Sequence, residues 1–248
     1  MNIKFLHLNI MLADHPDKVA RFIKTQDFDI INFQEVTGGI LSKSVPDSFG
    51  YFKKVLNLNG ELVKSWSATD DGKSYFGNAT FFKKSFKLLK KEEIRLKSYV
   101  VIPDYINRRI EDDPHSALSL TLKYGSKTFS VINTHLAWEP TPKDKPFKTA
   151  QALKLYHYLQ KIERPFIFSG DFNLTPDSKV VKMMNGVGRN LTTENGVKNT
   201  LNPHLHRIKN LSLVVDYVFV NFDTKVLNFE VVNDDISDHY GLSAKIEI

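Results

Sequence analysis

No cysteine occurs among the 248 residues of the chain. That absence excludes a disulfide-stabilised scaffold, a thiolate nucleophile and a zinc site with cysteine ligands. The sequence also lacks an apolar run of membrane-spanning length, a phosphate-binding P-loop, a nucleophile elbow and the helix signature of zinc proteases. These absences disfavour the corresponding classes of protein.

The charge balance is mildly basic, because 34 Lys and Arg residues outnumber 28 Asp and Glu residues and leave a net charge of +6. Such an excess fits a polyanionic or phosphate-bearing substrate, although many enzymes with neutral substrates share it. The N-terminus has no basic segment followed by an apolar core and a cleavage site. We therefore expect a cytoplasmic protein, with the mature form of a secreted protein as the alternative, and we assume a monomer.

Strand-like and helix-like segments alternate along the whole chain, without an internal repeat or a low-complexity linker. This pattern predicts one mixed α/β domain over residues 1–248. The opening predicts a strand at Ile3–Met11, a helix at Asp17–Gln26, and a short apolar strand at Asp29–Gln34 that ends at Glu35. A second helix is expected at Thr149–Ile162, and further strands at Thr80–Phe86, Ser119–Lys123, Thr128–His135, Phe166–Ser169, Val214–Val220, Val226–Val232 and Leu242–Ile248.

Charged and amide side chains interrupt or end several of these apolar strands. A carboxylate buried in an apolar strand is costly unless it is paired or binds a cation. One such residue is usually structural, but several at strand ends indicate a site, because α/β scaffolds build their sites there. Carboxylates suit Mg²⁺ or Mn²⁺, and histidines can act on a phosphate near neutral pH. The residues concerned are Asn9, Glu35, His135, Asp171, Asn173, Asp216, Asp238 and His239.

Short motifs carry these residues: Leu8-Asn9-Ile10, Phe33-Gln34-Glu35-Val36, Asn133-Thr134-His135-Leu136, Gly170-Asp171-Phe172-Asn173, Val215-Asp216-Tyr217-Val218-Phe219-Val220 and Ser237-Asp238-His239. In this order they resemble the endonuclease/exonuclease/phosphatase superfamily. Each motif alone is a weak signal, whereas the full set, with each motif in or beside a predicted strand, is specific for the fold. The resemblance spans nearly the whole chain. It implies a four-layer α/β sandwich of two packed mixed β-sheets flanked by helices.

The resemblance also implies a divalent-metal site. Glu35 should be the principal ligand of Mg²⁺ or Mn²⁺, helped by Asn9 and Asp238. Repair exonucleases of the superfamily often carry an acidic residue shortly after the first asparagine, where this chain has the apolar run Ile10-Met11-Leu12. This departure weakens an assignment to DNA repair and leaves the phosphodiester chemistry intact.

For catalysis, the resemblance implies that Asp171 orients or deprotonates the attacking water and that Asn173 positions it. His239, paired with Asp216, should stabilise charge that builds on the phosphate. His135 should contact the phosphate or serve the leaving group. One more histidine, His7, lies on the same side of its strand as Asn9, and the pattern fits a residue of the site as well as an ordinary strand residue.

The substrate is less constrained than the chemistry. The loop Trp138–Lys148 carries Trp138, Lys143, Lys145 and Lys148, and cations beside an aromatic side chain suit a phosphate backbone with stackable bases. We therefore expect a nuclease acting on DNA or RNA, although a solubilising loop would have the same composition. A phospholipid such as sphingomyelin or a small phosphoester stays open as the substrate. A catalytically silent binding protein is the third hypothesis, and the complete polar set argues against it.

Overall fold

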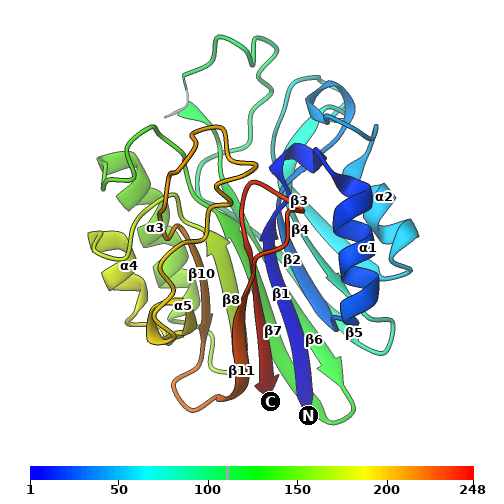
Figure 1. The fold of residues 1–248 in the computed structure, drawn as a ribbon, viewed down its shortest axis with the longest axis vertical. Helices are drawn as coiled ribbons and strands as arrows, with labels where there is room; N and C mark the ends of the chain where they lie inside the picture. Colours follow the sequence, from blue (N-terminus) through cyan, green and yellow to red (C-terminus); the bar gives the residue numbers. More distant parts are fainter. Residues whose placement is uncertain (110–111) are drawn as a thin grey trace.

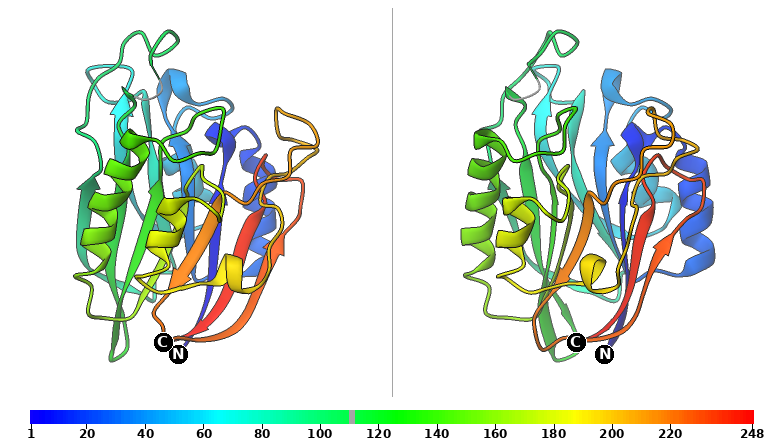
Figure 2. Two further views of the ribbon diagram at one scale, coloured as in Figure 1. Left: turned by 90° about the vertical axis from the view of Figure 1, so that its left-hand side faces the viewer. Right: turned by 60° about the vertical axis from the view of Figure 1, so that its left-hand side comes forward.

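The computed structural model describes residues 1–109 and 112–248. Two β-sheets pack face to face, and helices cover the outer face of each sheet (Figure 1; Figure 2). This arrangement confirms the expected four-layer sandwich. No helix in the described part of the chain is long and apolar enough to cross a membrane.

Each sheet has six strands among the described residues. In spatial order, the first sheet consists of β11 (Lys225–Val232), β12 (Gly241–Glu247), β1 (Asn2–Asn9), β2 (Ile30–Thr37), β4 (Tyr75–Phe82) and β3 (Asn59–Ser67). The second consists of β5 (Lys87–Arg95), β6 (Ser116–Tyr124), β7 (Lys127–His135), β8 (Phe166–Asp171), β10 (Asp216–Val220) and β9 (Arg189–Asn190). The helices are α1 (Pro16–Gln26), α2 (Ser48–Val55), α3 (Pro146–Leu159), α4 (Lys179–Met184) and α5 (Leu191–Glu194), with 3₁₀ turns η1 (Met11–Ala13) and η2 (Gly39–Leu41).

A parallel pair of strands lies inside each sheet, β1 beside β2 and β7 beside β8. Parallel strands end at the same edge of a sheet, so Asn9 lies in register with Gln34, and His135 with Asp171. The chain termini lie together at the opposite end of the sandwich, as Figure 1 shows. The predicted site residues therefore lie at the end of the sandwich away from the termini.

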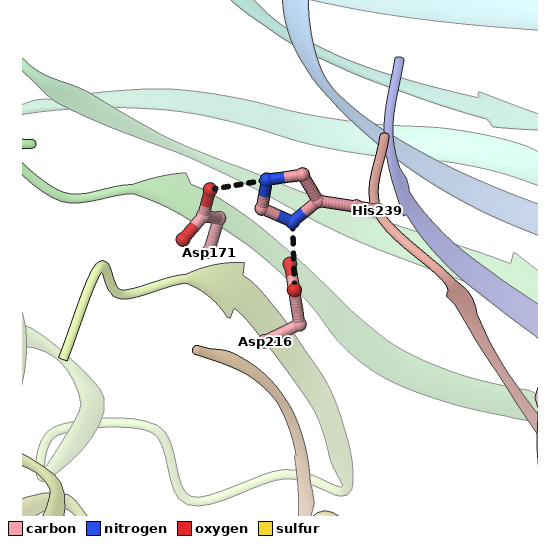
Figure 3. Close-up of side chains that lie close together, drawn as sticks. All are labelled: Asp171, Asp216 and His239. Atoms are coloured by element: carbon pink, nitrogen blue, oxygen red, sulfur yellow. Dashed lines mark hydrogen bonds and ion pairs between the residues drawn. The ribbon is translucent and has the colours of Figure 1, made fainter. Parts of the chain in front are cut away.

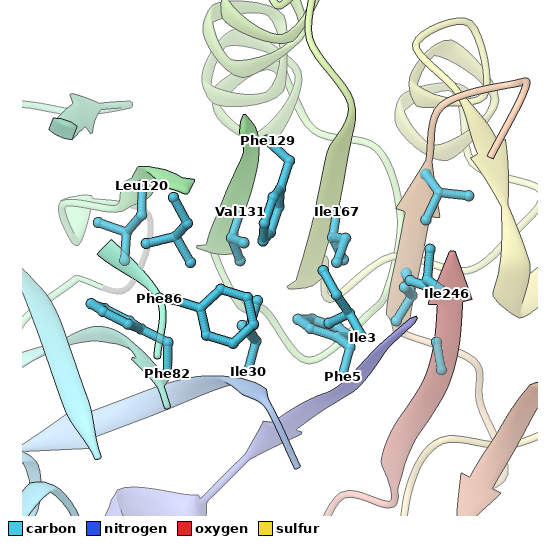
Figure 4. Close-up of a cluster of buried hydrophobic side chains, with 14 of the residues drawn as sticks. Ile3, Phe5, Ile30, Phe82, Phe86, Leu120, Phe129, Val131, Ile167 and Ile246 are labelled. Atoms are coloured by element: carbon cyan, nitrogen blue, oxygen red, sulfur yellow. The ribbon is translucent and has the colours of Figure 1, made fainter. Parts of the chain in front are cut away.

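The interior between the sheets changes character along the strands. Toward the termini it is an apolar cluster that includes Ile3, Phe5, Ile30, Phe82, Phe129, Val131 and Ile167 (Figure 4). Side chains of a strand point inward at every second residue, so β1 presents Ile3, Phe5, His7 and Asn9 to the interior in turn. The last two are buried polar residues, and the change from apolar to polar marks the loop end.

Several elements differ from the sequence-based expectation. β2 does not end at Glu35 but continues to Thr37. β5 was not anticipated, because its sequence is mostly charged and its side chains are largely exposed, so it lacks the apolar alternation of a half-buried strand. α3 begins at Pro146 rather than Thr149, because proline is favoured in the first turn of a helix.

Candidate active site

Asn9 and Glu35 meet where β1 ends and β2 bends. The Asn9 amide nitrogen lies 3.2 Å from Glu35 Oε1 and 3.1 Å from Asp171 Oδ2, so it links carboxylates of the two sheets. Between Phe33 and Val36, β2 has one residue more than its partner β4. At this bulge Glu35 adopts a left-handed backbone with φ of 56°, which costs an L-residue about 1–2 kcal/mol. Bulges of this kind redirect a side chain beside an active site.

The electrostatic surroundings of Glu35 fit a cation. Burial raises the pKa of Glu35, and the carboxylate of Asp238 raises it further, while the imidazoles of His135 and His239 lower it. Glu35 and Asp238 are both half-buried, and two neighbouring carboxylates repel each other unless a cation lies between them. Carboxylate and amide oxygens are also the donors that Mg²⁺ and Mn²⁺ prefer. Glu35 and Asp238 are thus suited to a metal by charge and by donor type. The Asn9 amide oxygen accepts the backbone N–H of Met11 at 3.0 Å, and the Asn9 amide nitrogen faces the carboxylates of Glu35 and Asp171.

Asp171 lies at the end of β8, at the centre of the site. Its Oδ1 accepts the backbone N–H of Asn173 at 2.9 Å, and Asn173 has a left-handed backbone with φ of 52°. The Asn173 amide nitrogen lies 3.0 Å from His135 Nε2 and 3.0 Å from the carbonyl oxygen of Leu136. His135 Nε2 is also 3.5 Å from Asp171 Oδ2. The structure therefore brings Asp171, Asn173 and His135 together as expected, and their roles remain predictions.

Asp216 and His239 form a close pair (Figure 3). His239 Nδ1 lies 2.8 Å from Asp216 Oδ2, and His239 Nε2 faces Asp171 Oδ2 at 3.9 Å. Burial alone lowers the pKa of His239, but the carboxylates of Asp216 and Asp171 more than offset this effect and raise it well above its ordinary value. Burial opposes ionisation of Asp216, yet its two imidazole partners, His239 and His7, hold the pKa of Asp216 below its usual range. Both shifts favour the charged form of the pair, a carboxylate beside an imidazolium.

The second imidazole partner of Asp216 is His7, whose role the sequence left open. His7 is fully buried, and its Nε2 lies 2.9 Å from Asp216 Oδ1. Its other ring nitrogen, Nδ1, lies 3.1 Å from the hydroxyl of Ser169. The signal in the sequence was the alternation of β1, which places His7 on the same face as Asn9.

A pocket of about 210 Å³ is lined by several of the predicted site residues. Asp238, which is half-buried, is one of the lining residues. The lining also includes Trp138, together with Arg207 and Ile208, two residues for which the sequence gave no specific signal. The lining consists of Glu35, Asp171, Asn173, Asp238, His239, Trp138, Glu139, Pro140, Pro142, Leu201, His206, Arg207, Ile208, Leu211, Leu213 and Val215.

The prediction that Lys148 contacts substrate is wrong. Because α3 begins at Pro146, Lys148 lies inside the helix and is fully buried, and its ammonium group donates to the backbone carbonyl of Asn173 at 3.2 Å. Lys148 thus supports the strained turn at Asn173. Lys143 and Lys145 are exposed and flank Asp144, which accepts the backbone N–H groups of Lys179 and Val180 and so fixes the loop to the start of α4.

Comparison with known proteins agrees with this geometry. The model of the Endonuclease/Exonuclease/phosphatase family matches residues 6–239. The chain belongs to this family. Members of the Endonuclease/Exonuclease/phosphatase family act on phosphoester bonds, so the chain is a phosphoester hydrolase.

The chain is similar to curated proteins and to solved structures. The CCR4-Not complex 3′-5′-exoribonuclease subunit Ccr4 of Aspergillus oryzae is 30% identical over 167 residues, which are 60% of this chain and 21% of that protein. A probable subunit of the same name from Vairimorpha ceranae is 30% identical over 152 residues, 52% of this chain and 28% of that protein. The chain thus spans about a quarter of the length of the curated relatives it matches. Among solved structures, an endonuclease/exonuclease/phosphatase from Bacteroides vulgatus superposes with a TM-score of 0.79 at 20% identity, covering 100% of this chain and 99% of the other, which shows the fold.

Proposed function

We propose that the chain hydrolyses phosphodiester bonds of nucleic acid with the help of Mg²⁺ or Mn²⁺. The observation that carries this proposal is the pocket beside the catalytic residues, which joins them to a wall that contains Trp138 and Arg207. An indole ring and a guanidinium group are the partners that suit a base and a phosphate. The similarity to the Ccr4 subunits, which are 3′-5′-exoribonucleases by name, supports the same substrate class.

The residues divide the chemistry between them. Glu35, with Asn9 and Asp238, would hold the cation, which supplies Lewis-acid stabilisation of the phosphate when bound. Asp171 accepts a proton from the attacking water, and Asn173 restricts where that water lies. His239 carries a positive charge opposite the place where negative charge builds on the phosphoryl oxygens, and Asp216 keeps it in its charged form. His135 lies beside Asn173 and contacts the phosphate or the leaving group.

The metal requirement is tested with a generic substrate, bis-p-nitrophenyl phosphate. Removal of divalent ions with EDTA should abolish turnover, and Mg²⁺ or Mn²⁺ should restore it. Glu35→Gln should lower turnover about 10³-fold, since a cation contributes several kcal/mol to the transition state and each tenfold change in rate is about 1.4 kcal/mol. Glu61→Gln, a half-buried glutamate on β3, is the matched control. A Glu35→Gln enzyme with the Mg²⁺ dependence of the wild type would refute the metal assignment.

The substrate class is tested with single-stranded RNA and DNA of one sequence, beside the generic phosphodiester and sphingomyelin vesicles. Replacing Lys143 and Lys145 with alanine should slow oligonucleotide cleavage and flatten its salt dependence, because each lysine neutralises about one phosphate. The matched control replaces Lys123 and Lys127, which are exposed at the opposite end of the sandwich. Trp138→Ala should weaken oligonucleotide binding by about 1–3 kcal/mol and Trp138→Phe by less.

A small phosphoester is the second candidate. A pocket of about 210 Å³ accommodates one ring with its phosphate and does not by itself require a polymer. Under this alternative, the lysine variants leave all rates unchanged and the oligonucleotides are poor substrates. Turnover of sphingomyelin vesicles without oligonucleotide cleavage would support the lipid alternative instead.

A further inference from the structure

A chain of hydrogen bonds runs through the interior of the sandwich and ends at Asp216. The Thr80 hydroxyl donates to Asn32 Oδ1 at 2.7 Å, and the Asn32 amide nitrogen donates to the Ser169 hydroxyl oxygen at 3.0 Å. Ser169 lies 3.1 Å from His7 Nδ1, and His7 Nε2 lies 2.9 Å from Asp216 Oδ1. All five side chains are fully buried, and the chain crosses between the two sheets.

The donors and acceptors of this chain define one direction. Both hydrogens of the Asn32 amide are used, one by Ser169 and one by the carbonyl oxygen of Ile132 at 3.0 Å. The Ser169 hydroxyl can then donate to His7 Nδ1, in the tautomer of His7 that has its hydrogen on Nε2 and donates it to Asp216 Oδ1. This assignment satisfies every one of these polar atoms, whereas a hydrogen on Nδ1 would leave the Ser169 hydroxyl without one of these acceptors.

Packing alone does not explain why these residues are polar. One inward position closer to the termini, the same strands carry Phe5, Ile30, Phe82 and Ile167, which form part of the apolar cluster in Figure 4. A buried polar group contributes to stability only when it is fully hydrogen-bonded, and an apolar layer of the same shape is often as stable. The polar layer therefore has a reason other than filling the interior, and that reason lies at its end, on Asp216.

Asp216 has one oxygen for each histidine. Oδ1 accepts from His7, and Oδ2 accepts from His239 Nδ1 at 2.8 Å. A carboxylate held on one side only can rotate about its terminal bond, and its partner imidazole then loses its fixed orientation. With both oxygens held, His239 Nε2 is kept facing Asp171.

We propose that His7 is a positioning residue for the catalytic pair: it fixes Asp216 through Oδ1 and thereby orients His239. The proposal rests on the proposed function, in which His239 acts on the phosphate. His7 touches neither the substrate nor the proposed cation, and it acts through Asp216.

Two substitutions at His7 separate this role from a structural one. In His7→Gln the side-chain amide nitrogen reaches the place of imidazole Nε2, so the bond to Asp216 is retained. In His7→Asn the amide is too short and reaches only toward Ser169. His7→Asn should lower kcat about 10–100-fold, the usual effect of losing a partner of this kind, with KM and the apparent Mg²⁺ affinity within about threefold. His7→Gln should recover most of kcat. Phe5→Leu, on the same strand in the apolar cluster, is the control for lost stability and should keep kcat.

A second measurement does not depend on turnover. In metal-free protein labelled with ¹⁵N-histidine, the proton on His239 Nδ1 should give a downfield signal, because it bonds to a carboxylate. The signal should persist in His7→Gln and in Phe5→Leu, and it should shift or broaden through exchange with water in His7→Asn. If His7→Asn does not fold, Ser169→Ala, which removes the partner of His7 Nδ1, should change the signal and kcat in the same direction by a smaller amount.

The outcomes separate the two proposals. If the signal responds as expected but no phosphodiester is cleaved by the wild type, the positioning role stands and the proposed function fails. If His7→Asn, or Ser169→Ala in its place, leaves both the signal and kcat unchanged, the positioning role is overturned. The positioning role is also overturned if His7→Gln and His7→Asn lose kcat equally while the His239 signal stays in place.

Discussion

The two halves of the sandwich interior lie on the same strands, but one half is apolar and the other is polar and hydrogen-bonded. Near the termini, the inward side chains are Ile3 and Phe5 on β1 and Ile167 on β8, part of the apolar cluster. Two residues further along the same strands, they are His7 and Ser169, buried and joined by a hydrogen bond. The backbone pairing of β1 with β2 and of β7 with β8 continues unchanged from one half to the other.

This difference shows how one pair of sheets can combine a stabilising apolar core with a polar layer that contributes little to stability. The apolar half buries aliphatic and aromatic surface at roughly 25 cal/mol per Å². The polar half gains little in net terms, because its hydrogen bonds replace bonds to water. Stability and catalysis therefore depend on different residues of the same strand. Substitutions should change the free energy of unfolding and the turnover number independently.

The largest expected effect is on catalysis and belongs to the polar half. Asp216→Asn and His239→Ala should each lower turnover about 10²–10⁴-fold, since each removes half of one charged pair. Residues that act as a unit lose activity non-additively, so the double variant should be little worse than either single variant. Steady-state rates on bis-p-nitrophenyl phosphate check this. A double variant that loses the full product of the single effects would show that the two residues act independently.

In the apolar half, the expected effect is on folding. Phe129→Ala should lower the free energy of unfolding by about 3–5 kcal/mol, because it leaves a cavity in the apolar cluster. The turnover number of the remaining folded protein should be unchanged. Urea unfolding and active-site-normalised rates measure the two quantities. A large loss of turnover in folded Phe129→Ala would contradict the separation of the halves.

Loss of folding stability at low pH should also originate at the polar end of the interior. Burial lowers the pKa of His115 to about 3 from 6.5, and its Nδ1 lies 2.9 Å from the carbonyl oxygen of His135. Below pH 6.5 the unfolded chain takes up a proton that the folded chain refuses until about pH 3, so this contribution to stability falls as the pH falls through that window. The loss from this group should be on the order of 2 kcal/mol between pH 7 and pH 5.

The test compares unfolding free energies at the two pH values. His115→Gln should show a smaller difference than the wild type, because glutamine does not titrate. Phe129→Leu, a substitution in the apolar half, should keep the wild-type difference. Equal pH dependence in His115→Gln and the wild type would exclude His115 as the cause.

The smallest expected effect is a gain in stability. Glu35→Gly should raise the free energy of unfolding by about 1 kcal/mol relative to Glu35→Ala, because glycine adopts the left-handed backbone without strain. Both variants lack the carboxylate, so the difference between them isolates the backbone. Thermal or urea unfolding measures it, and a lower stability for Glu35→Gly would show that the bulge carries no strain.

Much of this architecture was readable from the sequence. Apolar runs in the sequence predict the strands that form the sandwich interior. Polar residues at or beside the ends of these strands, such as Asp171 and His239, come together at one end of the sandwich. The bulge at Glu35 was not predictable, because an extra residue in one strand shows only against its partner β4.

The wrong prediction for Lys148, the open question at His7 and the missed pocket residues have different causes. Lys148 lies in sequence beside Lys143 and Lys145, but the proline that starts α3 turns it into the interior. His7 could have been assigned, because strand alternation already placed it next to Asn9 on the inward face. The pocket wall at Arg207 and Ile208 comes from a loop without regular structure, where no periodic pattern exists to be read.

The left-handed backbone at Glu35 has a consequence for directed evolution of this enzyme. Glutamate at this position is strained in the left-handed backbone conformation, but its carboxylate is necessary for the proposed metal site. A library selected only for survival of heating should therefore accumulate glycine at position 35 and return robust, inactive proteins. Selection for heat resistance must include turnover in every round, or it will remove the proposed metal site.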